Sequence, residues 1–132
     1  MSIDPNLRLP IAISCGAIAG SLGRYYLNMA IDNWWGTVFP WGIFVINITG
    51  CWLIGLLYSL VNMRVIHISS ELNIMLTTGF LGAYTTFSTY GLGVIKLLEE
   101  SWILGMSYAV GSAFLGISSV RLGIIMAHWF RN

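Results

Sequence analysis

The most unusual stretch of this sequence is residues 79–90, where hydroxyl groups are crowded into the centre of an apolar run. It contains Gly79 and Gly82, followed by a cluster of hydroxyl-bearing residues, Thr85, Thr86, Ser88 and Thr89. Glycine frees the backbone, and clustered Ser and Thr compete for its hydrogen bonds, so both weaken a helix. Hydroxyls can donate hydrogen bonds to an anion, and carbonyls released by a broken helix can hold a cation. The stretch therefore predicts an ion or substrate site.

The element that carries this stretch is long enough to cross a membrane. No Asp, Glu, Lys or Arg occurs between residues 72 and 95, and at about 1.5 Å per residue a helix of this length spans a bilayer. At membrane depth a broken helix persists only where it is buried in protein or faces a water-filled path. We therefore expect the third of four membrane-spanning helices to be broken near its middle.

The composition places the whole chain in the membrane. It has 132 residues, of which 57% are hydrophobic and only 8% are charged, and its mean hydropathy is +0.79. Soluble domains carry about 25% charged residues. Four apolar stretches, at about 9–30, 39–62, 72–97 and 102–129, predict an all-α integral membrane protein in which residues 1–132 form one four-span domain. The net charge of +1 argues against a nucleic-acid partner.

An even number of spans places both termini on one side of the membrane. The side of the termini has Arg8, Arg64, Arg131 and, near the end of the last span, Arg121, and the other side has Arg24 and Lys96. Basic loops set the orientation of a membrane protein, and here their bias is small. Four helices leave little room to enclose a pore, so we expect an oligomer. An antiparallel arrangement of subunits is physically possible.

Two strongly polar residues in the first two spans each have two alternative roles. Asn47 lies roughly two helical turns past Pro40, at a depth where an unpaired amide costs several kcal/mol. It either forms a helix–helix hydrogen bond or donates to a permeating anion.

Arg24 lies near the far end of the first span, where it either snorkels to the headgroups or forms an anion-attracting mouth. Gly16 and Gly20 form a GxxxG pair, which permits another helix to approach closely.

The other polar groups inside the expected spans are neutral, and no carboxylate accompanies them. Tyr108 and Ser112 are four residues apart and share a helix face. A path of such donors suits a small anion. Phe87 and Tyr90 add positively polarised ring edges, although aromatic residues at helical spacing also serve simple packing. Proton-coupled or cation-coupled exchange normally needs an intramembrane acid, so the lack of one argues against an exchanger. The sequence shows no catalytic triad and no metal-ligand cluster, which argues against an enzyme.

The same residues resemble the Fluc (CrcB) family of fluoride channels. The third-span pattern is Gly79-Phe80-x-Gly82-x-x-Thr85-Thr86-Phe87-Ser88-Thr89-Tyr90, the first span adds Gly16-x-x-x-Gly20-x-x-x-Arg24-Tyr25, and the second adds Val45-x-Asn47-x-x-Gly50-Cys51. The resemblance covers nearly the whole chain at consistent spacing. It implies a dual-topology homodimer in the cytoplasmic (inner) membrane, with antiparallel subunits. Such a dimer conducts fluoride passively through two pores and relieves fluoride toxicity.

The resemblance also implies roles for individual residues. Fluoride would pass the ring edges of Phe87 and Tyr90 beside Asn47. The full pathway would comprise Asn47, Thr86, Phe87, Ser88, Tyr90, Tyr108 and Ser112. Arg24 would lie at the aqueous vestibule. The backbone carbonyls of Gly82 and Thr85 would hold a structural Na⁺ at the dimer interface.

Three departures from the family pattern bear on these roles. Tyr90 stands where the family commonly has Phe, which keeps the ring edge and adds a hydroxyl. Ala83 and Tyr84 replace the more usual Gly and small apolar residue, which affects how the break is packed. Gly116 offers no hydroxyl on the polar face of the last span.

Two other functional classes remain: a small multidrug exporter, which should carry a Glu in its first span, and a non-transporting structural subunit, whose polar residues serve only packing.

Overall fold

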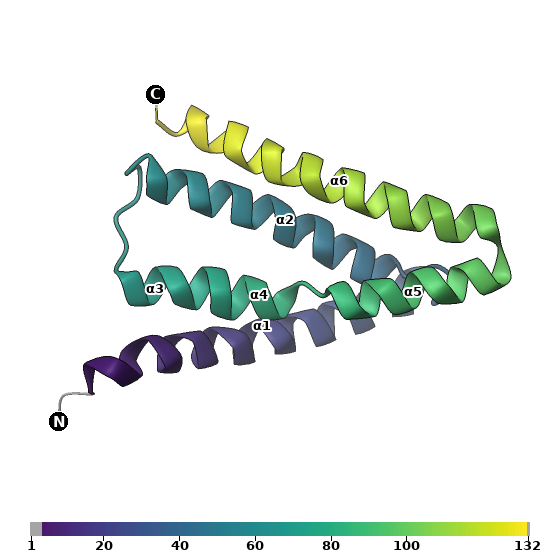
Figure 1. The fold of residues 1–132 in the computed structure, drawn as a ribbon, viewed down its shortest axis with the longest axis horizontal. Coiled ribbons are helices and arrows are strands. Elements are labelled where there is room, and N and C mark those ends of the chain that lie inside the picture. The colour runs from purple at the N-terminus through teal and green to yellow at the C-terminus, as the bar shows by residue number, and fades with distance from the viewer. Residues whose placement is uncertain (1–3, 132) are drawn as a thin grey trace.

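The computed structural model describes residues 4–131, and all regular secondary structure within them is helical. The helices are α1 (Pro5–Trp35), α2 (Trp41–Asn62), α3 (Ser70–Ile74), the π-helix η1 (Met75–Leu81), α4 (Gly82–Tyr84), α5 (Phe87–Glu100) and α6 (Trp102–Trp129). Successive passes run in opposite directions: α1, then α2, then the series from α3 to α5, then α6. Both ends of the chain therefore lie at the same end of the molecule (Figure 1). The expected all-α fold is confirmed.

The third pass is broken at Thr85 and Thr86, as the sequence predicts. Both backbones are extended, with ψ 159° at Thr85 and φ −151° at Thr86, so α4 ends and a new helix, α5, begins after them. The hydroxyl of Thr86 caps α5 by accepting the N–H of Thr89 at 3.3 Å. Such a cap satisfies one of the donors that the start of a helix leaves without a partner.

The first half of the third pass departs from regular α geometry. Met75–Leu81 form a π-helix, whose i→i+5 hydrogen bonds make a wider turn; the sequence does not predict it. This segment lies against α1, where a Cβ on Gly16 or Gly20 would collide with the η1 backbone. A Cβ on Gly79 would lie 2.6 Å from the carbonyl oxygen of Ile13. The glycine pair therefore permits close helix contact, and the contact is within the chain.

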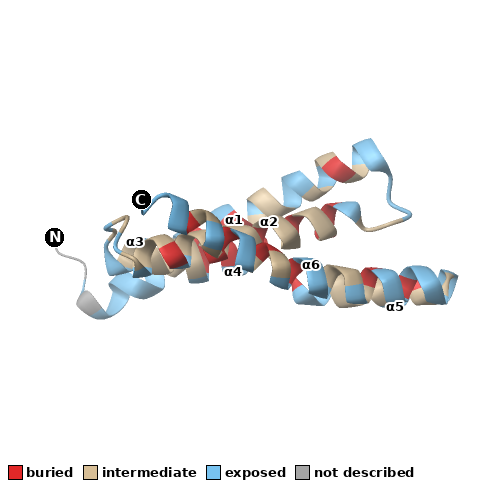
Figure 2. Cartoon of the chain, turned by 90° about the horizontal axis from the view of Figure 1, so that it is seen from above, coloured by how far each residue is buried: buried red, intermediate tan, exposed pale blue. Residues whose placement is uncertain are grey.

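Helices α2 and α6 are each long and apolar enough to cross a membrane. They pack closely, because a Cβ on Gly55 would collide with the carbonyl group of Val120. Large apolar side chains remain on the outside of the chain; Phe114 is 69% exposed and Ile117 is 74% exposed, and Figure 2 shows exposed segments along the helices. Extensive apolar exposure is typical of a surface that contacts a membrane or another protein. These features support a membrane protein.

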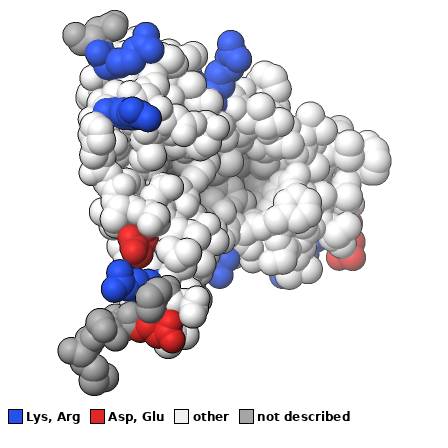
Figure 3. Space-filling model, turned by 60° about the vertical axis from the view of Figure 1, so that its left-hand side comes forward, with Lys and Arg blue, Asp and Glu red and all other residues white. Residues whose placement is uncertain are grey.

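Charged residues avoid the centre of the face shown in Figure 3, where the coloured atoms lie near the margins. At one of the loops, Ser69 caps α3 by accepting the N–H of Leu72 at 3.1 Å. The next two residues are Ser70 and Glu71, and the Ser70 hydroxyl donates a hydrogen bond to the Glu71 carboxylate at 3.2 Å. A hydrogen bond from its own backbone N–H, together with one from the Ser70 hydroxyl, lowers the pKa of Glu71.

Candidate functional site

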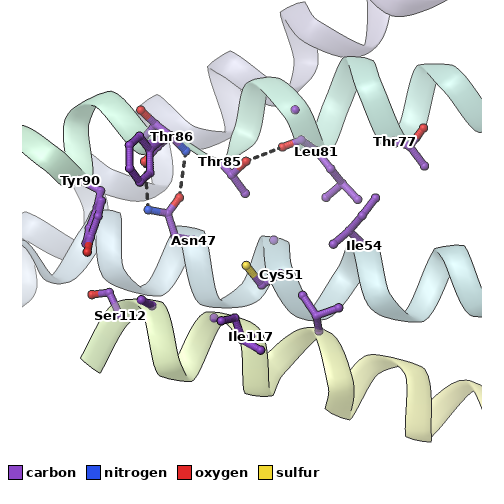
Figure 4. A pocket seen from close by; sticks show the side chains of 16 residues that line it. Asn47, Cys51, Ile54, Thr77, Leu81, Thr85, Thr86, Tyr90, Ser112 and Ile117 are labelled. Atoms are coloured by element: carbon purple, nitrogen blue, oxygen red, sulfur yellow. Dashed lines mark hydrogen bonds between the residues drawn. The ribbon is translucent and has the colours of Figure 1, made fainter. Parts of the chain in front are cut away.

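A cavity of about 490 Å³ lies beside the break, between the third pass, α2 and α6 (Figure 4). Seven of the predicted site residues line it: Asn47, Gly82, Thr85, Thr86, Phe87, Tyr90 and Ser112. The fold thus brings together residues from three separate stretches of sequence. Arg24, Ser88 and Tyr108 are not part of the lining. Thr77 and Cys51, to which the sequence assigns no role in a pathway, contribute to it as well.

Asn47 on α2 is joined to the break by a pair of hydrogen bonds. Its Nδ2 donates to the carbonyl oxygen of Thr86 at 3.1 Å, and its Oδ1 accepts the N–H of Thr86 at 2.9 Å (Figure 4). The amide therefore satisfies both main-chain groups of a residue that has left the helix. A primary amide carries two N–H groups, so one remains for another acceptor. The helix–helix hydrogen bond is present, and donation to an anion stays a prediction.

Arg24 reaches the same break from α1. Its Nη1 donates to the carbonyl oxygen of Thr85 at 3.4 Å. Because α1 continues to Trp35, Arg24 lies about three turns from the end of the helix, not close to it as expected. Snorkelling to the headgroups and a role at a vestibule both stay predictions. The carbonyl that receives Arg24 is one of the two expected to hold Na⁺.

Phe87 and Tyr90 are neighbours in the first turn of α5, with ring centroids 5.6 Å apart. Phe87 is 84% exposed on the single chain although it is a large apolar residue. Tyr90 is anchored, because its hydroxyl donates to the carbonyl oxygen of Ala109 on α6 at 2.8 Å. The hydroxyl that distinguishes Tyr90 from the family's usual Phe therefore joins α5 to α6.

Tyr108 and Ser112 present buried hydroxyls that have no protein partner. Within residues 4–131, theirs are the two buried side-chain polar atoms for which the structure contains no hydrogen bond. Tyr108 is 2% exposed and its ring lies between those of Phe39 and Tyr90, at centroid distances of 5.2 and 5.4 Å. A buried hydroxyl without a partner costs about 1–3 kcal/mol, so such groups call for an explanation. Of the two residues, Ser112 lines the cavity, so its hydroxyl is the one placed to donate to a ligand there.

The other hydroxyls of the break bond mainly to nearby groups of the same pass. The Oγ1 of Thr86 lies 3.1 Å from the Oγ1 of Thr89 and 3.3 Å from the Oγ of Ser88. The hydroxyl of Thr85 donates to the carbonyl oxygen of Leu81 at 3.0 Å. Part of the hydroxyl cluster therefore supports the break itself, and the contribution of Ser88 to a pathway stays a prediction.

Tyr84, one of the departures from the family pattern, is accommodated by α2. Its hydroxyl lies 3.0 Å from the Oγ1 of Thr49, and its ring stacks on Phe80 at a centroid distance of 5.8 Å. Gly50 makes room for this arrangement, because a Cβ there would meet the side chains of Thr85 and Tyr84. The sequence contains the signal, a glycine three residues after Asn47, but does not reveal its partner.

Comparison with known proteins identifies the family. The family model described as "CrcB-like protein, Camphor Resistance (CrcB)" matches residues 11–124. A protein of Trichormus variabilis named "Fluoride-specific ion channel FluC" is 47% identical over 124 residues, which cover 93% of this chain and 90% of that protein. Proteins with the same name from a Synechococcus strain and from Phocaeicola vulgatus are 40% and 42% identical, over 98% and 89% of this chain and 99% and 96% of theirs. This chain therefore belongs to the CrcB family.

Proposed function

We propose that this protein is a fluoride-selective channel that passively exports fluoride across the cytoplasmic membrane and thereby relieves fluoride toxicity. The observation that carries the proposal is the pair of unpartnered hydroxyls of Tyr108 and Ser112, the second of which lines the cavity together with Asn47 and Phe87. Fluoride is small and strongly hydrated, so a pathway must offer donors that replace its water. The names of the relatives, fluoride-specific ion channels, support the same ion.

The residues suggest an order of events along the pathway. The guanidinium of Arg24 attracts the anion toward the break, because a positive charge in a cleft raises the local anion concentration. Beside Asn47 the ion meets the ring edges of Phe87 and Tyr90, which are positively polarised. The uncommitted N–H of Asn47 and the hydroxyl of Ser112 supply hydrogen bonds there. All of these groups except Arg24 are neutral, so the ion is solvated without being trapped.

The second part of the proposal is an antiparallel homodimer whose subunits each cross the membrane four times. The exposed ring of Phe87 and the apolar walls of the cavity support it, because a partner subunit would cover them. The same surface of both subunits would meet across a two-fold axis in the membrane plane. The weak bias in the distribution of basic residues is compatible with insertion in both orientations.

The dimer would hold a structural Na⁺ between its two breaks, bound by the backbone carbonyls of Gly82 and Thr85. Both residues line the cavity, and hard cations prefer oxygen ligands. Residues 4–131 contain no group of three or more His, Cys, Asp or Glu placed to bind a metal, so neutral oxygens would be the ligands here. When bound, the ion supplies a fixed positive charge that holds the two breaks together.

Fluoride efflux from liposomes that contain the purified protein tests the proposal. A fluoride electrode follows release after an ionophore removes the opposing potential, and the measurement is repeated with chloride. We expect fast release of fluoride and no release of chloride. A well-folded dimer that releases neither ion would leave the structural-subunit alternative standing and reject the channel.

A further inference from the structure

The N–H of Thr86 is the group that a continuous helix would direct to the carbonyl of Gly82, four residues earlier. Here it donates to Asn47 Oδ1 at 2.9 Å. The extended backbone at Thr85, with ψ 159°, turns the chain out of the helix just before this N–H. The carbonyl of Gly82 has therefore lost its helical donor. A backbone carbonyl at membrane depth needs another partner.

Gly82 lies where a ligand can reach it. The residue is exposed and lines the cavity, and a Cβ built on it would come no closer to a neighbouring atom than 3.8 Å, at the carbonyl oxygen of Thr77. The carbonyl of Thr85, in contrast, already receives the guanidinium of Arg24 at 3.4 Å. Because two positive charges on one oxygen repel each other, Gly82 provides the stronger cation ligand of the two.

We propose that Asn47 is a positioning residue for the cation site, because its Oδ1 takes the Thr86 N–H and so releases the Gly82 carbonyl to bind Na⁺. The inference rests on the proposed function for the dimer and for its cation. The two ends of one amide then serve two sites: the oxygen sets the cation ligand, and the nitrogen faces the fluoride pathway. Without the oxygen, the N–H of Thr86 is free to donate to the carbonyl oxygen of Gly82 again, which would make that oxygen a poorer ligand for Na⁺.

Two substitutions of Asn47 distinguish the role of the amide oxygen from that of the amide nitrogen. Asn47→Asp keeps an oxygen that can accept the Thr86 N–H but removes the amide nitrogen, whereas Asn47→Ala removes both. The purified dimer is heated in detergent at increasing NaCl, with N-methyl-D-glucamine chloride keeping the ionic strength constant. Size-exclusion chromatography then gives the temperature at which half of the dimer has dissociated. The quantity compared is the NaCl concentration that produces half of the maximal stabilisation.

We expect Asn47→Ala to raise this half-stabilising concentration by about tenfold or more, because a ligand stabilises only in proportion to its affinity for the folded state. Asn47→Asp should not raise it by more than about threefold, since the acceptor is retained and the added carboxylate attracts the cation. Fluoride efflux should fall in both variants, because both lose the amide nitrogen. A merely structural role for Asn47 would lower the dissociation temperature without changing the half-stabilising concentration.

Tyr84→Phe is the matched control. It removes the hydrogen bond to Thr49 on α2, next to the break, without touching Thr86. It should lower the dissociation temperature at every NaCl concentration and leave the half-stabilising concentration unchanged.

Two results would overturn the inference: a wild-type half-stabilising concentration in Asn47→Ala, or a wild-type dimer that does not respond to Na⁺. If Asn47→Ala gives no dimer, the Asp variant decides. A half-stabilising concentration at or below the wild-type value agrees with the retained acceptor and its added charge, and a rise of about tenfold overturns the inference. Wild-type fluoride efflux is measured on the same preparation. Absent efflux rejects the proposed function, whereas a Na⁺ response that Asn47→Ala weakens would still support the cation site.

Discussion

The hydroxyl of Tyr90 donates to the main-chain carbonyl of Ala109 at 2.8 Å and so ties the first turn of α5 to α6. The carbonyl belongs to a helix residue, so it gains a second hydrogen bond beyond the helical one. The bond also fixes the orientation of the Tyr90 ring, whose centroid lies 5.6 Å from that of Phe87. The hydroxyl therefore acts in positioning the aromatic pair.

Tyr90→Phe should lower the free energy of unfolding by about 1 kcal/mol, the typical net value of one hydrogen bond. The ring edge remains, so fluoride efflux should stay within about threefold of wild type. Thermal unfolding in detergent and liposome efflux check the two parts separately. A large loss of efflux would mean that the hydroxyl itself contacts the ion.

Phe87→Leu should reduce fluoride efflux by roughly tenfold or more, because an aliphatic side chain has no polarised edge. The residue is 84% exposed on the single chain, so its replacement should change the stability of the subunit little. Phe114→Leu, at an exposed residue of α6 that is not part of the cavity lining, serves as the control. Equal efflux from both variants would show that the Phe87 ring does not act on the ion.

Ser112→Ala should leave the protein as stable as wild type or slightly more stable, because it removes a buried hydroxyl that has no partner. Leaving such a group unpaired costs about 1–3 kcal/mol. Fluoride efflux should fall in the same variant, since a donor is lost from the cavity wall. Tyr108→Phe should likewise be as stable as wild type. Its hydroxyl lies outside the cavity lining, so a fall in efflux in this variant would place it on a part of the pathway beyond the cavity. Unfolding and efflux measured on one preparation test this combination, and a stable variant with unchanged efflux would remove the hydroxyl from the pathway.

Gly20→Ala should lower the free energy of unfolding by about 1–3 kcal/mol, because its Cβ would collide with the backbone of η1 at Phe80. Gly111→Ala is the matched control on α6, where a Cβ meets no atom within 4 Å. Alanine is the better helix former, so this second variant should be stabilised by up to about 1 kcal/mol. Thermal unfolding of both distinguishes close packing from a general intolerance of alanine.

Local chemistry explains which features could be predicted. Glycines and hydroxyls act on their own backbone, so the break at Thr85 and Thr86 follows directly from the sequence. Apolar length is equally local, and the expected stretch 102–129 coincides with α6. The position of Asn47 also indicated that it needs a partner. The sequence did not reveal which group the partner is. It also could not decide between the two alternative roles of Asn47, because one amide can bond to the protein and donate to an ion at the same time.

Two features of the structure were not predicted: the continuation of α1 and the π-helix in the third pass. The first apolar stretch was expected to end at about residue 30, but α1 continues to Trp35. There Asn28 Nδ2 donates to Asp32 Oδ2 at 2.7 Å, one turn along the same helix face, so these polar groups satisfy each other. The end of the helix was therefore misjudged. The π-helix has no residue-type signature that distinguishes it from an α-helix.

The π-helix η1 acts on the rest of the third pass like a one-residue insertion. Deleting one residue from it would let the segment wind as an α-helix and would turn everything after it by about 100° around the helix axis. The contacts of Gly16 with the start of η1 would survive, but Gly82 and Thr85 would rotate away from the cavity wall. The extra residue therefore sets the angular phase between the face that packs on α1 and the face that carries the break.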